Sequence, residues 1–246
     1  GRGRTGCSGT RVSASAVKSA GLSFNARRYH GVVFDCDGVL VDSERITNRV
    51  WAGLLTDIGL PTTTEQSLAT YMGNTMARCL EIVEERLGRP APDDLLPRFH
   101  AAAREALAHE VVAVEGIVPL LDGLDAMGIP YAVASNGEHE KMRTTLGATG
   151  LLSRFDGRRF SASDVARPKP APDLYAHAVT VMGCAPNEVL AVEDSPLGVQ
   201  AAHAAGLTVI GYAELVAPER LIAAGAVTTV AQLSLLHTLW GMDEAN

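Results

Sequence analysis

The stretch "VVFDCDGVLVDSE", from Val32 to Glu44, decides the fold. Its apolar start is typical of a buried strand, which ends on Asp35 and Asp37, one residue apart, before a glycine. Two carboxylates held this close repel each other unless a cation offsets them. We therefore treat Asp35 and Asp37 as candidate functional residues and expect Cys36, between them, to point to the opposite side of the strand.

Three later segments share the near-continuous apolar character of the first. They are "YAVAS" (131–135), "VLAVEDS" (189–195) and "TVIGY" (208–212). Before each lies a helix-like segment: "VPLLDGLDAMG", "APDLYAHAVTVMG" and "PLGVQAAHAAG", all ending in glycine, a common helix stop. The alternation predicts an α/β fold with a doubly wound, Rossmann-like parallel sheet whose strands are buried on both faces.

The region 46–112 breaks this alternation. It contains no convincing strand and predicts four helices, in "TNRVWAGLLTDIG", "SLATYMG", "MARCLEIVEERLG" and "DLLPRFHAAAREALAHEV". We predict an inserted α-helical cap domain over 46–112, on an α/β core formed by 29–45 and 113–246. The alternative is that these helices only extend the core.

Composition excludes several classes of protein. The chain has 246 residues, 47% of them apolar, and a net charge of -7, which argues against nucleic-acid binding. No apolar run approaches the roughly 18 residues of a membrane-spanning helix. The four cysteines have no paired spacing, so we expect a reducing compartment. A cytoplasmic monomer acting on a small molecule is the prediction.

The first 28 residues differ from the rest, with six basic residues, no acidic one, and many glycines and serines. Two interpretations are open. The segment is left over from an expression vector, which we prefer, or it belongs to an Arg- and Ser-rich targeting peptide, which would send the protein to an organelle. We leave it out of the fold prediction.

Further polar residues follow the other predicted strands. Ser135 and Asn136 end the second, Glu193 and Asp194 end the third, and Lys169 lies between two prolines before a helix. In open α/β sheets functional groups gather at the carboxyl ends of the strands. Clustered carboxylates at one edge favour a bound cation, and oxygen ligands beside a glycine turn suit Mg²⁺.

Each feature alone has a plain structural explanation. The aspartates are usual in solvated loops, Ser135-Asn136-Gly137 is a common turn, and a lone lysine is most often a surface residue. Ser195 and Pro196 suit the start of a helix. The combination, with every feature at a strand end or in a neighbouring loop, is what indicates a site.

This combination resembles the haloacid dehalogenase superfamily of aspartate-nucleophile phosphohydrolases. "FDCDGVLVDSE", "ASNG", "RPKPAPDLY" and "VEDSPLGVQAA" resemble its four motifs in order, from Tyr29 to about Tyr212. The position of the insert resembles the subgroup with a small helical cap, which includes β-phosphoglucomutase and phosphoglycolate phosphatase. The wording of the first two motifs is most similar to members of the 6-phosphogluconate phosphatase type.

The resemblance implies a mechanism. Asp35 would attack phosphorus and form an aspartyl phosphate, and Asp37 would act as general acid and then general base. Ser135 and Lys169 would bind the phosphoryl oxygens, aided by the backbone at Asn136. The metal set, for Mg²⁺, would be Asp35, Asp37 through its backbone carbonyl, Asp194, and Glu193 as a ligand or an outer acceptor.

Positions at which this sequence differs from members of the resembled family narrow the range of expected reactions. The second aspartate, which haloacid dehalogenases lack, favours phosphoryl chemistry. Thr47 stands where the mutases have a histidine, and Met76, near Asn74, stands where they have an arginine; Arg49 and Arg78 are the other cations considered.

The prediction is therefore an Mg²⁺-dependent phosphatase acting on a sugar or sugar-acid phosphate, with Thr47, Asn74 and Met76 facing the substrate. A β-phosphoglucomutase-like mutase, a phosphoglycolate phosphatase and a non-catalytic relative are the alternatives.

Overall fold

The computed structural model describes residues 28–240, and its centre is a six-stranded parallel sheet in the order β3-β2-β1-β4-β5-β6. The strands are β1 (Gly31–Phe34), β2 (Tyr131–Ser135), β3 (Arg159–Ser161), β4 (Val189–Glu193), β5 (Thr208–Tyr212) and β6 (Thr228–Val230). The chain builds one half of the sheet outward from β1 and then returns to build the other half from β4. The doubly wound fold is confirmed, and β1 and β4 meet where the strand order reverses, a preferred ligand site.

The four predicted strands are present, but the sequence did not reveal β3 and β6. Both are three residues long and lie at the two edges of the sheet. The predictions for the first 28 residues fall almost wholly on residues 1–27, outside the part of the chain that the structure describes.

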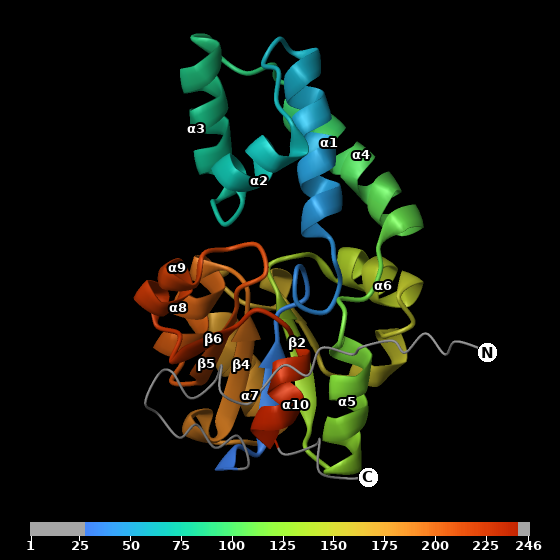
Figure 1. Cartoon of the computed structure of the whole chain (residues 1–246), viewed down its shortest axis with the longest axis vertical. Coiled ribbons are helices and arrows are strands. Elements are labelled where there is room, and N and C mark those ends of the chain that lie inside the picture. The colour runs from blue at the N-terminus through green and yellow to red at the C-terminus, as the bar shows by residue number, and fades with distance from the viewer. Residues whose placement is uncertain (1–27, 241–246) are drawn as a thin grey trace, which may run out of the picture.

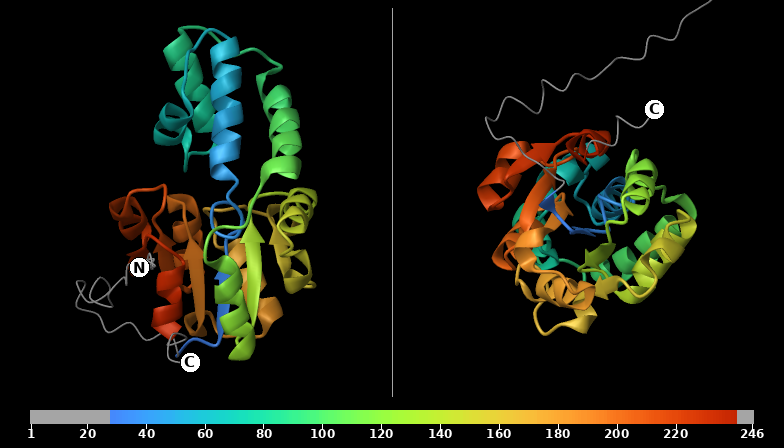
Figure 2. Two further views of the ribbon diagram at one scale, coloured as in Figure 1. Left: turned by 45° about the vertical axis from the view of Figure 1, so that its right-hand side comes forward. Right: turned by 90° about the horizontal axis from the view of Figure 1, so that it is seen from below.

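Helices cover both faces of the sheet (Figures 1 and 2). One face packs against α5 (Ile117–Ala126), α6 (His139–Ala148) and α10 (Ser234–Trp240), and the other against α7 (Asp173–Met182), α8 (Pro196–Ala204) and α9 (Pro218–Ala224). Short 3-10 helices are η3 (Leu152–Phe155), η4 (Ala162–Asp164) and η5 (Pro186–Glu188). Within β1, Val32 and Phe34 join the first core cluster and Val33 the second. This alternation explains why the strands are apolar throughout.

The helical insert lies between β1 and β2, as predicted, and stands beyond the carboxyl ends of the strands (Figure 1). It consists of α1 (Glu44–Asp57), α2 (Thr64–Tyr71), α3 (Met76–Leu87) and α4 (Leu95–Glu110). Its own core cluster is Trp51, Leu55, Tyr71, Cys79, Val83 and Leu95. The helices start at Glu44, two residues before the predicted cap; the domain boundaries themselves stay a prediction. We call this insert the cap.

The cap leaves and re-enters the core through two segments that run side by side. The Asp42 N–H donates to the Val112 carbonyl at 2.9 Å, and the Val114 N–H donates to the Leu40 carbonyl at 3.1 Å. Val41 and Ala113 form an antiparallel bridge between them. We call this pair of segments the junction.

No helix among residues 28–240 combines the length and the apolar character needed to cross a membrane.

Candidate active site

A cavity of about 790 Å³ lies between the cap and the carboxyl ends of the central strands. This volume falls in the range of small-molecule sites, roughly 300–1,000 Å³. The predicted residues that line it are Asp35, Asp37, Thr47, Asn74, Met76, Ser135, Asn136, Lys169 and Asp194. Glu193 is completely buried and lies beside them without lining the cavity. The fold thus brings together residues spread over 160 positions of the sequence.

Lys169 is the centre of the core side of the site. Its Nζ donates to Asp35 Oδ1 at 2.7 Å, to Glu193 Oε1 at 2.6 Å and to the Ala134 carbonyl at 2.8 Å. The side chain is only 4% exposed, so these three acceptors use its three protons away from bulk water. The two carboxylates hold the pKa of Lys169 well above its usual range although burial opposes this. Lys169 is therefore a permanent cation at the Asp35 carboxylate.

Glu193 is fixed from several directions. Tyr175 Oη donates to Glu193 Oε1 at 2.6 Å, and Ser195 Oγ donates to Oε2 at 3.2 Å. Gly198, in the first turn of α8, lies so close that a Cβ there would overlap the Glu193 carboxylate. The Glu193 oxygens are thus already engaged by the protein, and the residue is placed to orient Lys169.

Asn136 positions Lys169 through the backbone. Its Nδ2 donates to the Lys169 carbonyl at 3.1 Å, and its Oδ1 accepts from the Lys169 N–H at 2.9 Å. The backbone of Asn136 was predicted to help bind the substrate, and its side chain is paired with the loop that carries Lys169. This pairing sets where the lysine enters the site.

Asp37 is bound by a second set of partners. Lys141 Nζ lies 2.8 Å from Asp37 Oδ2, Ser43 Oγ donates to Oδ1 at 2.8 Å, and Ser135 Oγ is 3.5 Å from Oδ2. Burial by itself would raise the pKa of Asp37, but the Lys141 charge and the hydrogen bonds from Lys141 and Ser43 bring it below its usual value. Two neighbouring aspartates thus have separate lysines and different protonation behaviour.

Asp35, Glu193 and Asp194 form a candidate metal site. One carboxylate oxygen of each lies within 4.8 Å of the others. Burial raises the pKa of Asp35 to about 7, with Lys169 opposing and the Glu193 and Asp37 charges adding to the increase. Burial and then Asp35 also raise the pKa of Asp194, which has no ion pair among the described residues. Three carboxylates against one ammonium leave negative charge that a divalent cation bound by oxygen ligands would neutralise.

The turn after Asp37 accommodates Asp194. Gly38 has φ of +79°, a conformation that other residues adopt rarely, and a Cβ there would overlap the Asp194 carboxylate. Ser135 is also buried, and its Oγ accepts from the Gly137 N–H at 2.9 Å. Cys36 packs in the core away from the cavity, as expected, and burial raises the pKa of its thiol.

The predicted cap residues line the cavity without offering a charge. Thr47 Oγ1 donates to the Ser43 carbonyl at 3.1 Å, Asn74 Nδ2 donates to the Thr70 carbonyl at 3.1 Å, and Met76 is apolar. Arg49 and Arg78 do not line the cavity. They pair with acidic side chains of the cap, Glu110 for Arg49 and Glu81 and Glu85 for Arg78.

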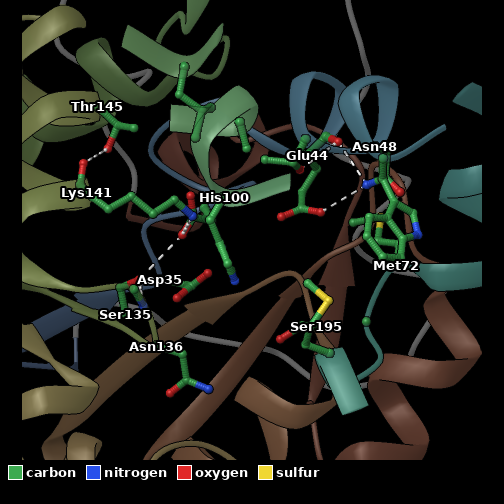
Figure 3. A pocket seen from close by; sticks show the side chains of 18 of the residues that line it. Asp35, Glu44, Asn48, Met72, His100, Ser135, Asn136, Lys141, Thr145 and Ser195 are labelled. Carbon is green, nitrogen blue, oxygen red and sulfur yellow. Dashed lines mark hydrogen bonds and ion pairs between the residues drawn. The ribbon is translucent and has the colours of Figure 1, made fainter. Parts of the chain in front are cut away.

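Among the cavity residues that sequence reasoning missed are Glu44, Asn48, His100, Arg104 and Lys141. Figure 3 shows Glu44 and Asn48 on the opposite side of the pocket from Lys141 and Ser135. Burial, followed by the Asp37 charge, raises the pKa of Glu44 to about 7, and Asn48 Nδ2 donates to Glu44 Oε2 at 3.4 Å. The spacing of His100 and Arg104 by four residues on one helix was the available signal, because such residues share a face.

The site lies at the carboxyl ends of a doubly wound parallel sheet, with paired aspartates after β1, and comparison with known proteins assigns its family. A profile of the haloacid dehalogenase-like hydrolases matches residues 32–212, and the chain belongs to this family. The 6-phosphogluconate phosphatase of Escherichia coli is 32% identical over 214 residues, which cover 87% of this chain and 95% of the relative. The predicted family and the prediction of a hydrolase are confirmed.

Solved structures agree with the fold. A haloacid dehalogenase-like protein of Agrobacterium tumefaciens has a TM-score of 0.79 and 32% identity, covering 88% of this chain and 100% of that one. A family hydrolase of Deinococcus radiodurans, solved with phosphate and sodium bound, has a TM-score of 0.76 and 30% identity, covering 87% and 96%. Phosphoglycolate phosphatases and β-phosphoglucomutase-like structures match at 25% to 30% identity.

Proposed function

We propose that this chain is an Mg²⁺-dependent phosphatase that hydrolyses a small phosphate monoester, a sugar or sugar-acid phosphate, through an aspartyl phosphate on Asp35. The observation that carries the proposal is the 2.7 Å contact between Lys169 Nζ and Asp35 Oδ1 at the floor of the cavity, beside two further buried carboxylates. Similarity to 6-phosphogluconate phosphatase and to a relative solved with bound phosphate supports the substrate class. A cytoplasmic monomer stays a prediction from composition.

In the first step an Asp35 oxygen attacks phosphorus, and the bond between phosphorus and the leaving oxygen breaks. Asp37, which carries the proton taken from water in the preceding turnover, gives it to that oxygen, so the product leaves as an alcohol. Ser135 binds a phosphoryl oxygen, and the charge of Lys169, held at the Asp35 carboxylate, lowers the repulsion between the attacking carboxylate and the phosphate. Because an aspartyl phosphate forms on Asp35, one difficult hydrolysis is divided into two easier phosphoryl transfers.

In the second step Asp37 takes a proton from water, and the water oxygen attacks phosphorus. The bond between phosphorus and Asp35 breaks, releasing phosphate and the free carboxylate. Lys141 and Ser43 stabilise the ionised form of Asp37, the form that this step requires.

The residues present fit Mg²⁺. Asp35, Asp194 and the backbone carbonyl of Asp37 would hold it, and Glu193, whose oxygens are engaged by Lys169, Tyr175 and Ser195, would act from the outer position. When bound, Mg²⁺ supplies neutralisation of the phosphoryl charge.

The four positions compared with the mutases do not favour a mutase. Thr47 and Met76 offer no cation for a second phosphate, and Arg49 and Arg78 are paired outside the cavity. Phosphoglycolate phosphatase activity remains an alternative for a substrate panel to decide.

The test is release of phosphate from a panel of sugar, sugar-acid, nucleotide and glycolate phosphates, with Mg²⁺, with EDTA and with Ca²⁺. We expect turnover only with Mg²⁺, and none for Asp35→Asn, because an amide is a poor nucleophile. The matched control is Asp42→Asn, since Asp42 pairs with Arg45 outside the cavity. Substantial turnover by a folded Asp35→Asn protein would refute the mechanism.

A further inference from the structure

The cap side of the cavity carries two basic side chains on one face of α4. His100 and Arg104 both line the cavity and are four residues apart, about one helical turn. The residues between them are alanines, of which Ala103 also lines the cavity. The small side chain of Ala103 leaves room beside the two longer ones.

Arg104 is set apart from the other cations of the site by its lack of a partner. Lys169 and Lys141 lie 2.7 Å and 2.8 Å from Asp35 and Asp37. Among the described residues, no hydrogen bond or ion pair is made by Arg104, although Arg49, Arg78 and Arg98 in the cap each pair with a carboxylate. The sole unpaired permanent positive charge among the described lining residues therefore faces the cavity from the cap.

The helix that carries this charge is held firmly. Phe99, next to His100, packs edge to face on Trp51 of α1 with ring centroids 5.1 Å apart, and the His100 ring lies 5.5 Å from the Phe99 ring. Trp51 belongs to the buried core of the cap. The basic face of α4 is thus presented by packed helices and not by a loop.

We propose that Arg104, with His100, forms a subsite for a carboxylate at the end of the substrate remote from its phosphate, so that the preferred substrate is the phosphate ester of a sugar acid. The inference rests on the proposed phosphatase function. A guanidinium matches a carboxylate with two parallel hydrogen bonds. One permanent charge balances one carboxylate, whereas a second phosphate would bring close to two negative charges.

The test compares two open-chain substrates that differ at a single carbon, 6-phosphogluconate and sorbitol 6-phosphate. The first ends in a carboxylate where the second ends in a hydroxymethyl group. We expect the wild type to have the higher kcat/KM for the acid. Arg104→Gln should lower the ratio of the two kcat/KM values about 10- to 100-fold, the range for a lost hydrogen bond to a charged group. His100→Gln should lower it less.

The matched control is Arg98→Gln, on the same helix but outside the cavity, which should leave the ratio within about twofold of the wild type. Calorimetric titration of 6-phosphogluconate into the Asp35→Asn protein with Mg²⁺, with and without Arg104→Gln, measures the subsite without turnover. The Kd should rise by a similar factor.

The outcomes separate the two proposals. Equal losses on both substrates, or a wild-type preference for sorbitol 6-phosphate, would overturn the subsite while the phosphatase stands. A larger loss on glucose 1,6-bisphosphate than on 6-phosphogluconate would overturn the carboxylate assignment in favour of a second phosphate. No release of phosphate from any ester, p-nitrophenyl phosphate included, would overturn both proposals.

Discussion

The core side and the cap side of the cavity differ in how far their polar groups are already paired. On the core side, Lys169, Glu193 and Asp37 have their hydrogen-bonding partners within the protein, and Lys169 and Glu193 are almost free of solvent. On the cap side, His100 and Arg104 are exposed and have no hydrogen-bonding partner among the described residues. Groups that take part in chemistry gain from being fixed before the substrate arrives. Groups that choose the substrate must keep their hydrogen bonds for it.

Among variants that keep the Asp35 nucleophile, the largest expected loss of turnover is on the core side, at Asp37. Asp37→Asn should lower the turnover of an alkyl phosphate such as a sugar phosphate by about 10²- to 10⁴-fold, the usual size of a general acid-base contribution. The first step with p-nitrophenyl phosphate should suffer much less, because nitrophenolate leaves without a proton. Stopped-flow and steady-state rates on both substrates provide the measurement. Equal losses in the first step would remove Asp37 from the acid role.

Two glycines, Gly198 in the core and Gly53 in the cap, test whether the core side of the cavity needs its present geometry. Gly198→Ala should displace Glu193, and Lys169 with it, because the new Cβ would overlap the carboxylate. We expect kcat to fall by roughly 10- to 100-fold and the free energy of unfolding to fall by about 1–3 kcal/mol.

The control is Gly53→Ala, in α1 of the cap, where a Cβ would meet nothing within 4 Å. It should raise the free energy of unfolding by about 0.5–1 kcal/mol and leave kcat unchanged. Chemical denaturation and phosphate release, run on both variants, give the comparison. Full activity of Gly198→Ala would show that Glu193 does not need its present position.

The third prediction concerns the charge of the core side. Because the pKa of Asp35 is raised to about 7 and that of Asp194 is raised as well, metal must compete with protons below pH 7. The affinity for Mg²⁺ should fall by about tenfold per pH unit for each proton displaced, from pH 7 downward. Calorimetry in two buffers of different ionisation enthalpy would count the protons. An affinity for Mg²⁺ that is constant between pH 5.5 and 8 would contradict the raised pKa values of Asp35 and Asp194.

The smallest expected effect is on stability, and it concerns Glu44, at the point where the cap meets the core. Its pKa rises from 4.5 to about 7 in the folded state, so the folded protein binds the proton more tightly than the unfolded chain. Stability is therefore lost as the pH rises from 4.5 to 7, and the whole penalty is present above pH 7. Glu44→Gln removes that penalty, by about 1–2 kcal/mol after allowance for partial exposure.

For this variant we expect Tm to rise by roughly 2–8 °C at pH 8 and to change little at pH 4.5, measured in EDTA. Glu105→Gln, an exposed change on α4 away from the cavity, serves as the control. An equal rise in Tm at both pH values would mean that Glu44 acts through packing and not through its charge.

The sequence predicted the core side far better than the cap side, and the reason is physical. Strands buried on both faces must be apolar throughout, so β1, β2, β4 and β5 can be recognised in the sequence as apolar runs. The ends of these strands then locate Asp35, Ser135 and Glu193. Edge strands carry no such requirement. In β3 and β6, "RFS" and "TTV" are short and partly polar, and nothing local distinguishes them from loops.

The partners of each side chain could not be predicted. Asn136 pairs with a backbone 33 residues away, and Lys141 reaches Asp37 across more than 100 residues, through contacts that exist only once the sheet has formed. Arg104 is an ordinary helical arginine in sequence. The packing of α4 against α1 turns it toward the cavity, where it makes no ion pair with any of the described residues.

The junction has a consequence for how such proteins can be recombined. Because Asp42 and Val114 bind the opposite segment, the cap enters and leaves the core at one place, and its two ends are already side by side. Exchanging everything between these two points for the corresponding helices of a relative would leave the loop-closure entropy almost unchanged. A chimaera joined there, with Ser43 retained, should therefore keep the hydrolytic machinery of its host and inherit the substrate preference of its donor. In this chain the cap is thus a unit that can be exchanged whole, and a pair of backbone hydrogen bonds marks its two ends.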